Sequence, residues 1–271
     1  MKQITGVGLK DVQEIYAGAI GDLWELVMGQ QIHIGGFNSS MDLAEKAGIG
    51  AGMRGVDLCC CTGAGMRFLV RFRGVNHMTG VDATQHVVDR GIERVKAEGL
   101  TDRIEFVVED VCKTGLPSGC ADFVWGEDAW CYVEDKTALI AEAVRLVKPG
   151  GTIAFTDWVE GANEMTPEEA NRFLDFMKFP SLQDIPGYAD MLRENGCEIV
   201  HAADTCRFSP QVDLYLNMLN TQHIYDALSI INFDMEMMHA MGKEMVFTQD
   251  LAHQGKVIQA LFVARKASNH E

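Results

Sequence analysis

Hydrophobic residues in the middle of the chain alternate between two spacings. Short apolar runs of the kind found in buried strands cover residues 55–60, 78–83, 104–111, 121–128 and 152–158. The intervening residues 64–73, 84–98 and 135–147 have the composition and period of helices. This alternation is typical of βαβ crossovers and predicts a mostly parallel sheet.

Both ends of the chain have a different pattern. Residues 10–29 place apolar side chains at helical spacing and predict one helix that stops at Gly29. Residues 197–205 and 256–265 predict two strands that pair as an antiparallel edge, and Met-rich helices over 209–253 interrupt them. We therefore expect an open α/β sheet with a helical insertion, built as a single domain over the whole chain. Its parts are an N-terminal helical segment (1–50), the sheet (51–206 and 254–266) and a helical cap insertion (207–253).

The composition fits a globular protein and limits its partners. Hydrophobic residues make up 47% and charged residues 23% of the 271 positions, which excludes general disorder. The chain has 23 Lys and Arg residues against 39 Asp and Glu residues, and its formal net charge is −16. Because this balance leaves no basic stripe to bind phosphates, we expect no nucleic acid partner.

Two further features bear on location and on metal binding. No run approaches the roughly 18 apolar residues of a membrane span, and residues 1–16 lack the apolar core of a signal peptide. We therefore expect a cytoplasmic protein with no membrane partner, whose eight cysteines stay free thiols. There is no CxxC spacing, and three consecutive cysteines at 59–61 are poorly placed to chelate one ion, so we expect no metal site.

Acidic and small residues follow four of the predicted strands, at the edge where an open parallel sheet binds its ligand. The first strand leads into a turn of small residues at 57–65, and the second ends in Asp82, an acid able to accept both hydroxyls of a ribose. The third and fourth strands end in Glu109-Asp110-Val111 and Gly126-Glu127-Asp128. The GxGxxG fingerprint of a pyrophosphate cofactor is absent. A nucleoside that carries an amine and a positive charge fits these acids better.

Four segments in this order resemble the class I S-adenosylmethionine-dependent methyltransferases. They are VDLCCCTGAG at the turn, GVDAT at the ribose acid, VVEDV at the adenine-contacting segment and RLVKPGGTIAFTDW after a helix. The resemblance implies a Rossmann-like class I methyltransferase sheet and S-adenosyl-L-methionine as the cofactor. The cofactor-binding positions that follow from it are Tyr16, His33, Asp57, Cys59, Gly63, Asp82, Ala83, Asp110, Val111 and Gly126.

The similarity is closer to small-amine N-methyltransferases of the sarcosine/dimethylglycine and phosphoethanolamine types. It rests on WELVMGQQIHIGGF, GMRFLVRFRGV, DFVWGEDAWCYVEDK and IAFTDW. We therefore expect an enzyme that methylates a small-molecule acceptor, with an amine nitrogen as the favoured target. Asp128, Tyr132 and His33 are the candidate catalytic residues. Tyr132 stands where those enzymes have a histidine, and a tyrosine is a poor base at neutral pH.

Cys59 and Cys61 replace two glycines of the family's turn. Cysteine does not adopt a positive φ cheaply, so either these positions keep ordinary β geometry or the cofactor sits slightly displaced. We interpret the triplet as the small apolar end of a buried strand; a thiolate nucleophile or a soft-ligand site is the alternative. Trp130, Tyr132 and Trp158 are expected to lie close together, as a cage for an ammonium group or as a cover for the sheet edge.

Other functions stay open at this point. The acceptor could instead be a quinone-type carbon, a thiol or thioether sulfur, or arsenite. The two lost glycines would also suit a catalytically silent cofactor-binding protein. The Met-rich helices are expected to close over the pocket or to pack as core, and a homo-oligomer stays open as the state of assembly.

Overall fold

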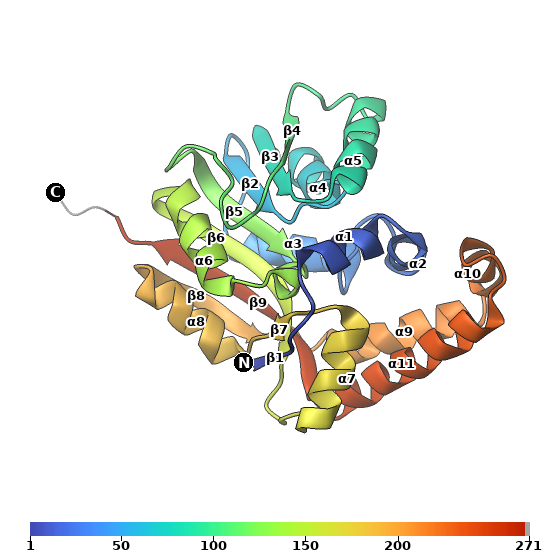
Figure 1. Cartoon of the computed structure of the whole chain (residues 1–271). Coiled ribbons are helices and arrows are strands. Elements are labelled where there is room, and N and C mark those ends of the chain that lie inside the picture. The colour runs from blue at the N-terminus through green and yellow to red at the C-terminus, as the bar shows by residue number, and fades with distance from the viewer. Residues whose placement is uncertain (269–271) are drawn as a thin grey trace.

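The computed structural model describes residues 1–268, and a seven-stranded sheet of order β4-β3-β2-β5-β6-β9-β8 forms its centre (Figure 1). The strands are β2 (Arg54–Leu58), β3 (His77–Asp82), β4 (Ile104–Val108), β5 (Ala121–Glu127), β6 (Val147–Glu160), β8 (Cys197–Asp204) and β9 (Val257–Lys266). Strand β9 runs antiparallel to both of its neighbours, and β4, β3, β2, β5 and β6 pair in parallel. The expected mostly parallel sheet with an antiparallel last strand is confirmed.

Helices cover both faces of this sheet (Figure 1). One face carries α3 (Gly36–Lys46), α4 (Ala64–Phe72) and α5 (Gln85–Ala97), and the other carries α6 (Lys136–Leu146) and α8 (Ile185–Glu194). Leu69 and Phe123 belong to the buried cluster of the first face, and Leu139, Tyr188 and Phe155 belong to that of the second. Because the strands are buried on both sides, their sequences read as continuous apolar runs.

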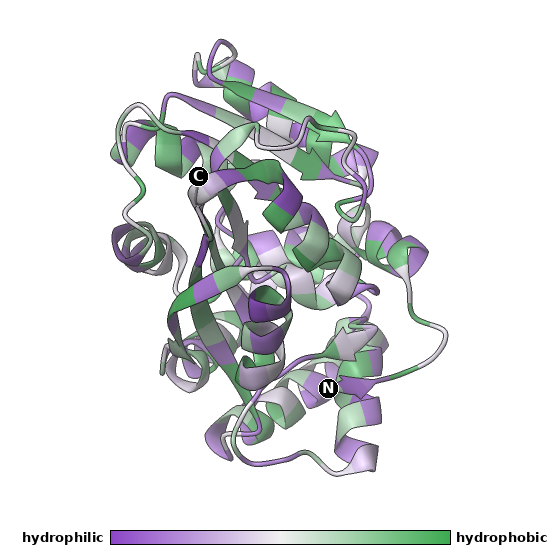
Figure 2. Ribbon diagram, turned by 90° about the vertical axis from the view of Figure 1, so that its left-hand side faces the viewer, coloured by the Kyte–Doolittle hydropathy of each residue, from purple (hydrophilic) through white to green (hydrophobic). Residues whose placement is uncertain are grey.

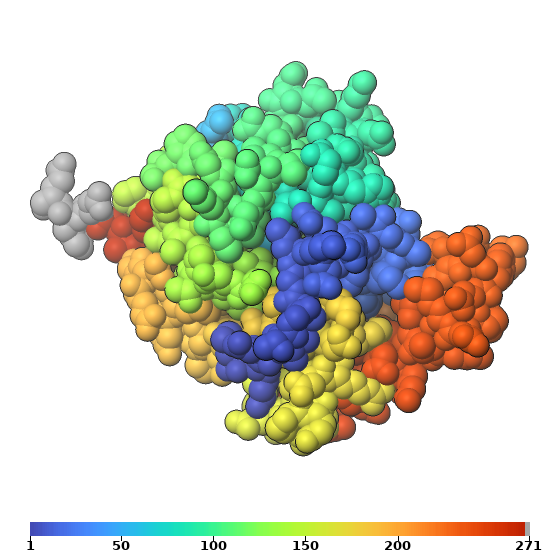
Figure 3. All heavy atoms as spheres, viewed as in Figure 1, coloured from blue at the N-terminus to red at the C-terminus, as the bar shows by residue number. Residues whose placement is uncertain are grey.

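The remaining helices gather beside the carboxyl ends of the parallel strands (Figures 1 and 3). They are α1 (Leu9–Tyr16), α2 (Ala19–Met28), α7 (Pro167–Met177), α9 (Phe208–Asn220), α10 (Ile224–Ile230) and α11 (Met235–His253), and a 3₁₀ turn η1 (Trp130–Tyr132) follows β5. Met237, Met238 and Met241 pack with Leu23 of α2 and Ala227 of α10. These three methionines of α11 are therefore half-buried between helices, whereas Met235 is exposed.

The N-terminal region differs from the expected single helix over 10–29. Gly18 is extended, with φ −117° and ψ −172°, and separates α1 from α2. Helical periodicity continues across this break because both helices carry apolar residues at helical spacing, so the pattern alone could not place it. A short strand, β1 (Lys2–Gln3), also pairs antiparallel with β7 (Ser181–Leu182), which the sequence did not predict.

The surface helices mix apolar and polar residues along their length, as amphipathic helices do (Figure 2). Within residues 1–268, every helix is too short or too polar to span a bilayer.

Candidate functional site

A cavity of about 420 Å³, the main cavity, lies at the carboxyl ends of β2, β3, β4 and β5, with α1 along one side. It gathers residues from the four strand ends that the sequence singled out. The predicted site residues that line it are Tyr16, Cys59, Asp82, Ala83, Asp110, Val111, Asp128 and Tyr132.

Two smaller spaces share lining residues with the main cavity. The inner pocket, of about 20 Å³, is lined by Tyr16, Trp24, Met28, Ile32, His33, Asp128, Tyr132, Trp158, Met177 and Phe179. The turn pocket, of about 50 Å³, includes His33, Asp57, residues 59–62, Gly65 and Glu127. His33 lines both of these spaces, and the inner pocket shares Tyr16, Ile32, Asp128 and Tyr132 with the main cavity.

The lining of the main cavity is acidic, and among the described residues it contains no lysine or arginine. Its carboxylates belong to Asp82, Asp110, Glu127, Asp128, Glu134 and Asp135. A cavity lined by one sign of charge favours a cationic ligand and disfavours a phosphate.

Asp82 joins the two loops that follow β2 and β3. Its Oδ2 accepts a hydrogen bond from the backbone N–H of Cys61 at 2.9 Å, and its Oδ1 accepts one from Thr84 at 2.8 Å. Burial raises the pKa of Asp82, although these hydrogen bonds oppose the shift. Gln13 of α1 donates to the carbonyl of Ala83 at 2.7 Å and ties α1 to the same loop.

The cysteine turn adopts the glycine-like conformation despite its side chains. Cys59 and Cys61 have φ values of 64° and 48°, in the left-handed region, and Gly63 begins α4 at 71°. Of the two alternatives for this turn, ordinary β geometry at Cys59 and Cys61 is therefore wrong, because both residues take a left-handed φ between β2 and α4. Burial raises the pKa of Cys61 to about 12 and that of Cys59 well above its usual value. Both thiols are thus protonated at neutral pH, as expected for structural residues.

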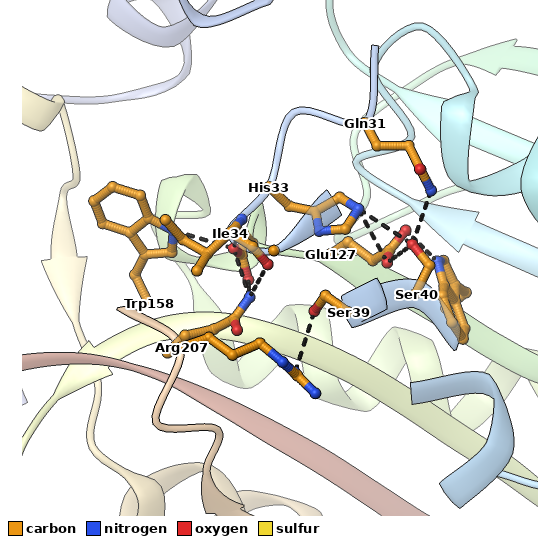
Figure 4. A network of polar contacts seen from close by, with 12 residues as sticks. Gln31, His33, Ile34, Ser39, Ser40, Glu127, Trp158 and Arg207 are labelled. Atoms are coloured by element: carbon orange, nitrogen blue, oxygen red, sulfur yellow. Dashed lines mark hydrogen bonds and ion pairs between the residues drawn. The ribbon is translucent and has the colours of Figure 1, made fainter. Parts of the chain in front are cut away.

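Asp128 lies in the loop after β5 at a φ of 51° and is 7% exposed. Its carboxylate accepts hydrogen bonds from the Ile34 N–H at 2.8 Å, Trp158 Nε1 at 3.3 Å and Gln259 Nε2 at 2.9 Å (Figure 4). These donors come from the N-terminal segment, β6 and β9. Asp128 therefore holds three parts of the site together as well as lining it.

His33 belongs to a buried network that sequence reasoning found only in part (Figure 4). Ser40 donates to Glu127 Oε1 at 2.6 Å, and His33 Nε2 lies 3.2 Å from Ser40 Oγ and 3.3 Å from Glu127 Oε1. Trp125 Nε1 donates to the other oxygen of Glu127 at 3.0 Å. Glu127 was visible as an acid at a strand end, whereas no local signal marks Ser40.

Tyr16 and Tyr132 meet over the main cavity. Their hydroxyl oxygens lie 3.1 Å apart, and their rings form an edge-to-face pair with centroids 5.5 Å apart. Burial is the largest cause that raises the pKa of each phenol above its usual value. Both hydroxyls are therefore protonated at neutral pH, and they are suited to positioning rather than to accepting a proton.

Two of the predicted residues, Gly126 and Trp130, have structural roles next to the cavities and do not line them. Gly126 does not line the cavities, but a Cβ there would lie 2.3 Å from Trp130 Nε1, so only glycine admits the indole. Trp130 itself is fully buried, stacks on Phe155 with centroids 4.0 Å apart and donates to the Leu58 carbonyl. It is a core residue and not part of an aromatic cage. Trp158 does line the inner pocket.

Asp57 faces the turn pocket, where burial and then the charge of Glu127 raise its pKa well above the usual value. All eight cysteines are free thiols. Within residues 1–268, no group of three or more His, Cys, Asp and Glu side chains is arranged to hold a metal ion.

Together, the fold and the acidic cavity define an α/β protein of the Rossmann-like type with a site suited to a cationic nucleoside. Residues 56–155 match the family described as a methyltransferase domain. Residues 56–155 thus carry a methyltransferase domain, as the sequence motifs predicted.

Known proteins similar to the chain include N- and C-methyltransferases. Phosphoethanolamine N-methyltransferase 1 of Arabidopsis thaliana is 27% identical over 67% of this chain and 36% of its own length. Sterol 24-C-methyltransferase ERG6B of Gibberella zeae is 30% identical over 53% of this chain and 40% of its own. The chain therefore spans less than half the length of either relative.

A solved structure shows the same fold over nearly the whole chain. It is described as a putative sarcosine dimethylglycine methyltransferase from Galdieria sulphuraria, and it superimposes with a TM-score of 0.80 at 20% identity. The match covers 95% of this chain and 98% of that one.

Proposed function

We propose that the protein transfers a methyl group from S-adenosyl-L-methionine to a small-molecule amine of the sarcosine or dimethylglycine type. The observation that supports this most directly is the row of carboxylates in a main cavity that lacks lysine and arginine among its described lining residues. A sulfonium nucleoside and an ammonium acceptor are both cations, so this lining suits both. It suits an acceptor that carries a phosphate less well.

The cofactor would be held at the strand ends. Asp82 is proposed to bind the ribose, and Ala83, Asp110 and Val111 the adenine side of the main cavity. The turn around Cys59, whose path depends on Gly63, would hold the methionine end beside Asp57 and His33, and Gly126 leaves room for Trp130 under the site. S-adenosyl-L-methionine supplies an activated methyl group on sulfur when bound.

The acceptor would be positioned by Asp128, Tyr132, Tyr16 and His33. In-line transfer requires the reacting atoms about 3–3.5 Å apart in a site cleared of water. The tyrosine pair and α1 cover the cavity and would exclude water, and Asp128 fixes the neighbouring segments. Because the phenols stay protonated, their contribution would be orientation of the acceptor.

We further propose a cytoplasmic protein whose only small-molecule partners are the cofactor and the acceptor, with no nucleic acid or membrane partner. A homo-oligomer is compatible with this function. The division into an N-terminal segment (1–50), a sheet (51–206 and 254–266) and a cap insertion (207–253) is retained as the working domain organisation.

Methylation of an apolar carbon is the second candidate. The inner pocket is lined mainly by aromatic and methionine side chains, and sterol C-methyltransferases are among the relatives. In that case Asp128 would stabilise the neighbouring segments of the protein and would not bind the acceptor.

Two measurements test the proposal. Calorimetric titration with S-adenosyl-L-methionine should show binding, and mass spectrometry should show methylation of glycine, sarcosine or dimethylglycine rather than of phosphoethanolamine, thiols, arsenite or quinols. Absence of S-adenosyl-L-methionine binding would contradict the proposed methyl transfer. Cofactor binding with methylation of a carbon acceptor would favour the second candidate.

A further inference from the structure

His33 combines deep burial with one unpaired ring nitrogen. The residue is 3% exposed, and its Nδ1 has no hydrogen-bond partner among the described residues, whereas Nε2 faces Ser40 and Glu127 (Figure 4). Buried polar atoms of native proteins are nearly always paired. An unpaired Nδ1 in a residue that lines the inner pocket therefore points to a ligand contact that completes it.

The network around Nε2 determines which nitrogen of His33 carries the proton. The single hydroxyl proton of Ser40 is donated to Glu127 Oε1 at 2.6 Å. Ser40 Oγ also accepts from Gln31 Nε2 at 2.9 Å. The remaining contact of Ser40 Oγ, to His33 Nε2 at 3.2 Å, can only be filled by an N–H donor on the ring. The Glu127 carboxylate lies 3.3 Å from the same nitrogen, and its negative charge favours a proton there.

In the neutral imidazole the proton consequently lies on Nε2, and Nδ1 presents a lone pair. The alternative, an imidazolium, would bury an unpaired N–H at Nδ1, which costs about 1–3 kcal/mol. A neutral imidazole whose far nitrogen is held by a carboxylate network has the arrangement of a general base.

We infer that His33 Nδ1 is the group that removes the proton from the methyl acceptor, and that Ser40 and Glu127 are positioning residues that keep the ring in the Nε2–H form. The inference rests on the proposed function and names its acceptor class, a small amine that arrives as an ammonium ion. It also explains how the site works with tyrosine at position 132, since neither Tyr16 nor Tyr132 is a base at neutral pH.

Proton transfer to His33 and methyl transfer to the acceptor together conserve atoms and charge. The ammonium proton moves to Nδ1, the freed nitrogen lone pair forms the N–CH₃ bond, and the electron pair of the S–CH₃ bond stays on sulfur. The positive charge of the protonated His33 then lies beside Glu127, and the proton leaves to water when the products dissociate. The other titratable groups that line the two pockets with His33 are Asp57, Cys59, Cys60, Cys61, Asp128, Tyr16 and Tyr132.

The tautomer can be measured without any acceptor. Protein labelled with ¹⁵N in its histidine rings is examined by long-range ¹H–¹⁵N correlation at pH 7, and the His33 signals are assigned by their loss in His33→Gln. The expected pattern is a protonated Nε2 and an unprotonated Nδ1 for His33, with the preference weakened in Ser40→Ala. A proton on Nδ1 would overturn the inference, whether or not the protein is a methyltransferase.

Turnover provides the second readout, with sarcosine and dimethylglycine as probes. His33→Gln should lower kcat/KM at least tenfold at pH 7 and leave cofactor affinity within about twofold, and the deficit should shrink at high pH, where the amine is already deprotonated. His239→Gln, an exposed position on α11, is the matched control and should behave as wild type.

The failures of the two proposals are distinguishable. Wild-type protein that binds the cofactor but methylates neither amine overturns the amine assignment. Amine methylation at the wild-type rate in His33→Gln overturns only the role of His33 as the base. Loss of cofactor affinity with unchanged kcat would make His33 a cofactor contact and overturn its role as the base.

Discussion

The hydroxyl of Tyr16 lies 3.1 Å from the hydroxyl of Tyr132, although 116 positions separate them in the chain. Helix α1 has no buried residue of its own. The contacts that attach it over the main cavity include this pair and the bond from Gln13 to the Ala83 carbonyl at 2.7 Å.

Removal of either hydroxyl should loosen this cover. Tyr16→Phe and Tyr132→Phe should each weaken the attachment of α1 over the main cavity by about 0.5–1.5 kcal/mol. Each should also raise the KM for the acceptor, because the two aromatic rings are then less well oriented. The double variant should cost less than the sum of the single ones, since both remove the same bond. Steady-state kinetics of the four proteins measure this coupling, and strictly additive effects would show that the hydroxyls act separately.

Asp82→Ala should weaken cofactor binding. The change leaves the ribose hydroxyls without their charged partner, at a cost of about 1.5–3 kcal/mol, or roughly 10- to 100-fold in Kd. The same carboxylate accepts from the Cys61 and Thr84 backbones, so thermal stability should fall as well. Calorimetry with S-adenosyl-L-methionine measures the affinity, and an unchanged Kd would remove Asp82 from the cofactor site.

Glycine at positions 59 and 61 should preserve or improve both stability and cofactor binding. Each cysteine holds a left-handed φ, which costs a non-glycine residue about 1–3 kcal/mol; the greater entropy of unfolded glycine offsets part of the gain. Cys60→Gly is the matched control, because Cys60 is buried and has no positive φ, so its replacement should destabilise. Folded Cys59→Gly/Cys61→Gly protein with normal cofactor affinity and no activity would instead make the thiols functional.

Asp128→Asn should affect the fold as well as the acceptor. An amide NH₂ would face one of the donors from Ile34, Trp158 or Gln259, and we expect a loss of about 1–3 kcal/mol in the free energy of unfolding. KM for an ammonium acceptor should rise, while cofactor affinity stays near normal. Denaturant unfolding and kinetics measure both quantities, and an unchanged kcat/KM would remove the main local support for a cationic acceptor.

The free energy of unfolding should fall as the pH rises, because the buried carboxyl of Asp157 loses a proton. Its buried carboxyl accepts from Tyr188 Oη at 2.6 Å and Cys131 N at 3.0 Å, yet burial raises its pKa to about 7. The folded protein thus binds a proton that the unfolded chain, with an ordinary pKa of about 3.9, has released. Its stabilising contribution is complete below about pH 4 and is lost as the pH rises through about 7. Unfolding free energies between these limits should show this slope in wild type and lose it in Asp157→Asn; equal slopes would contradict the shift.

Much of the fold could be predicted because its signals are local. Strand runs and helical periods are read within about ten residues, and the carboxyl ends of parallel strands meet at one edge. Asp82 and Asp110 could therefore be assigned to one site from the order of the strands alone. The break at Gly18 could not be located, since both α1 and α2 keep the same apolar period.

The sequence by itself determined the α/β architecture, the acidic strand ends and the methyltransferase motifs, because each is a property of neighbouring residues. Only the tertiary structure decided how the polar groups pair. It placed Gln259 on Asp128, 131 positions away, and left His33 Nδ1 without a partner among the described residues. Such pairing depends on which distant segments approach within about 3 Å of one another, and the local pattern of residues does not record those distances.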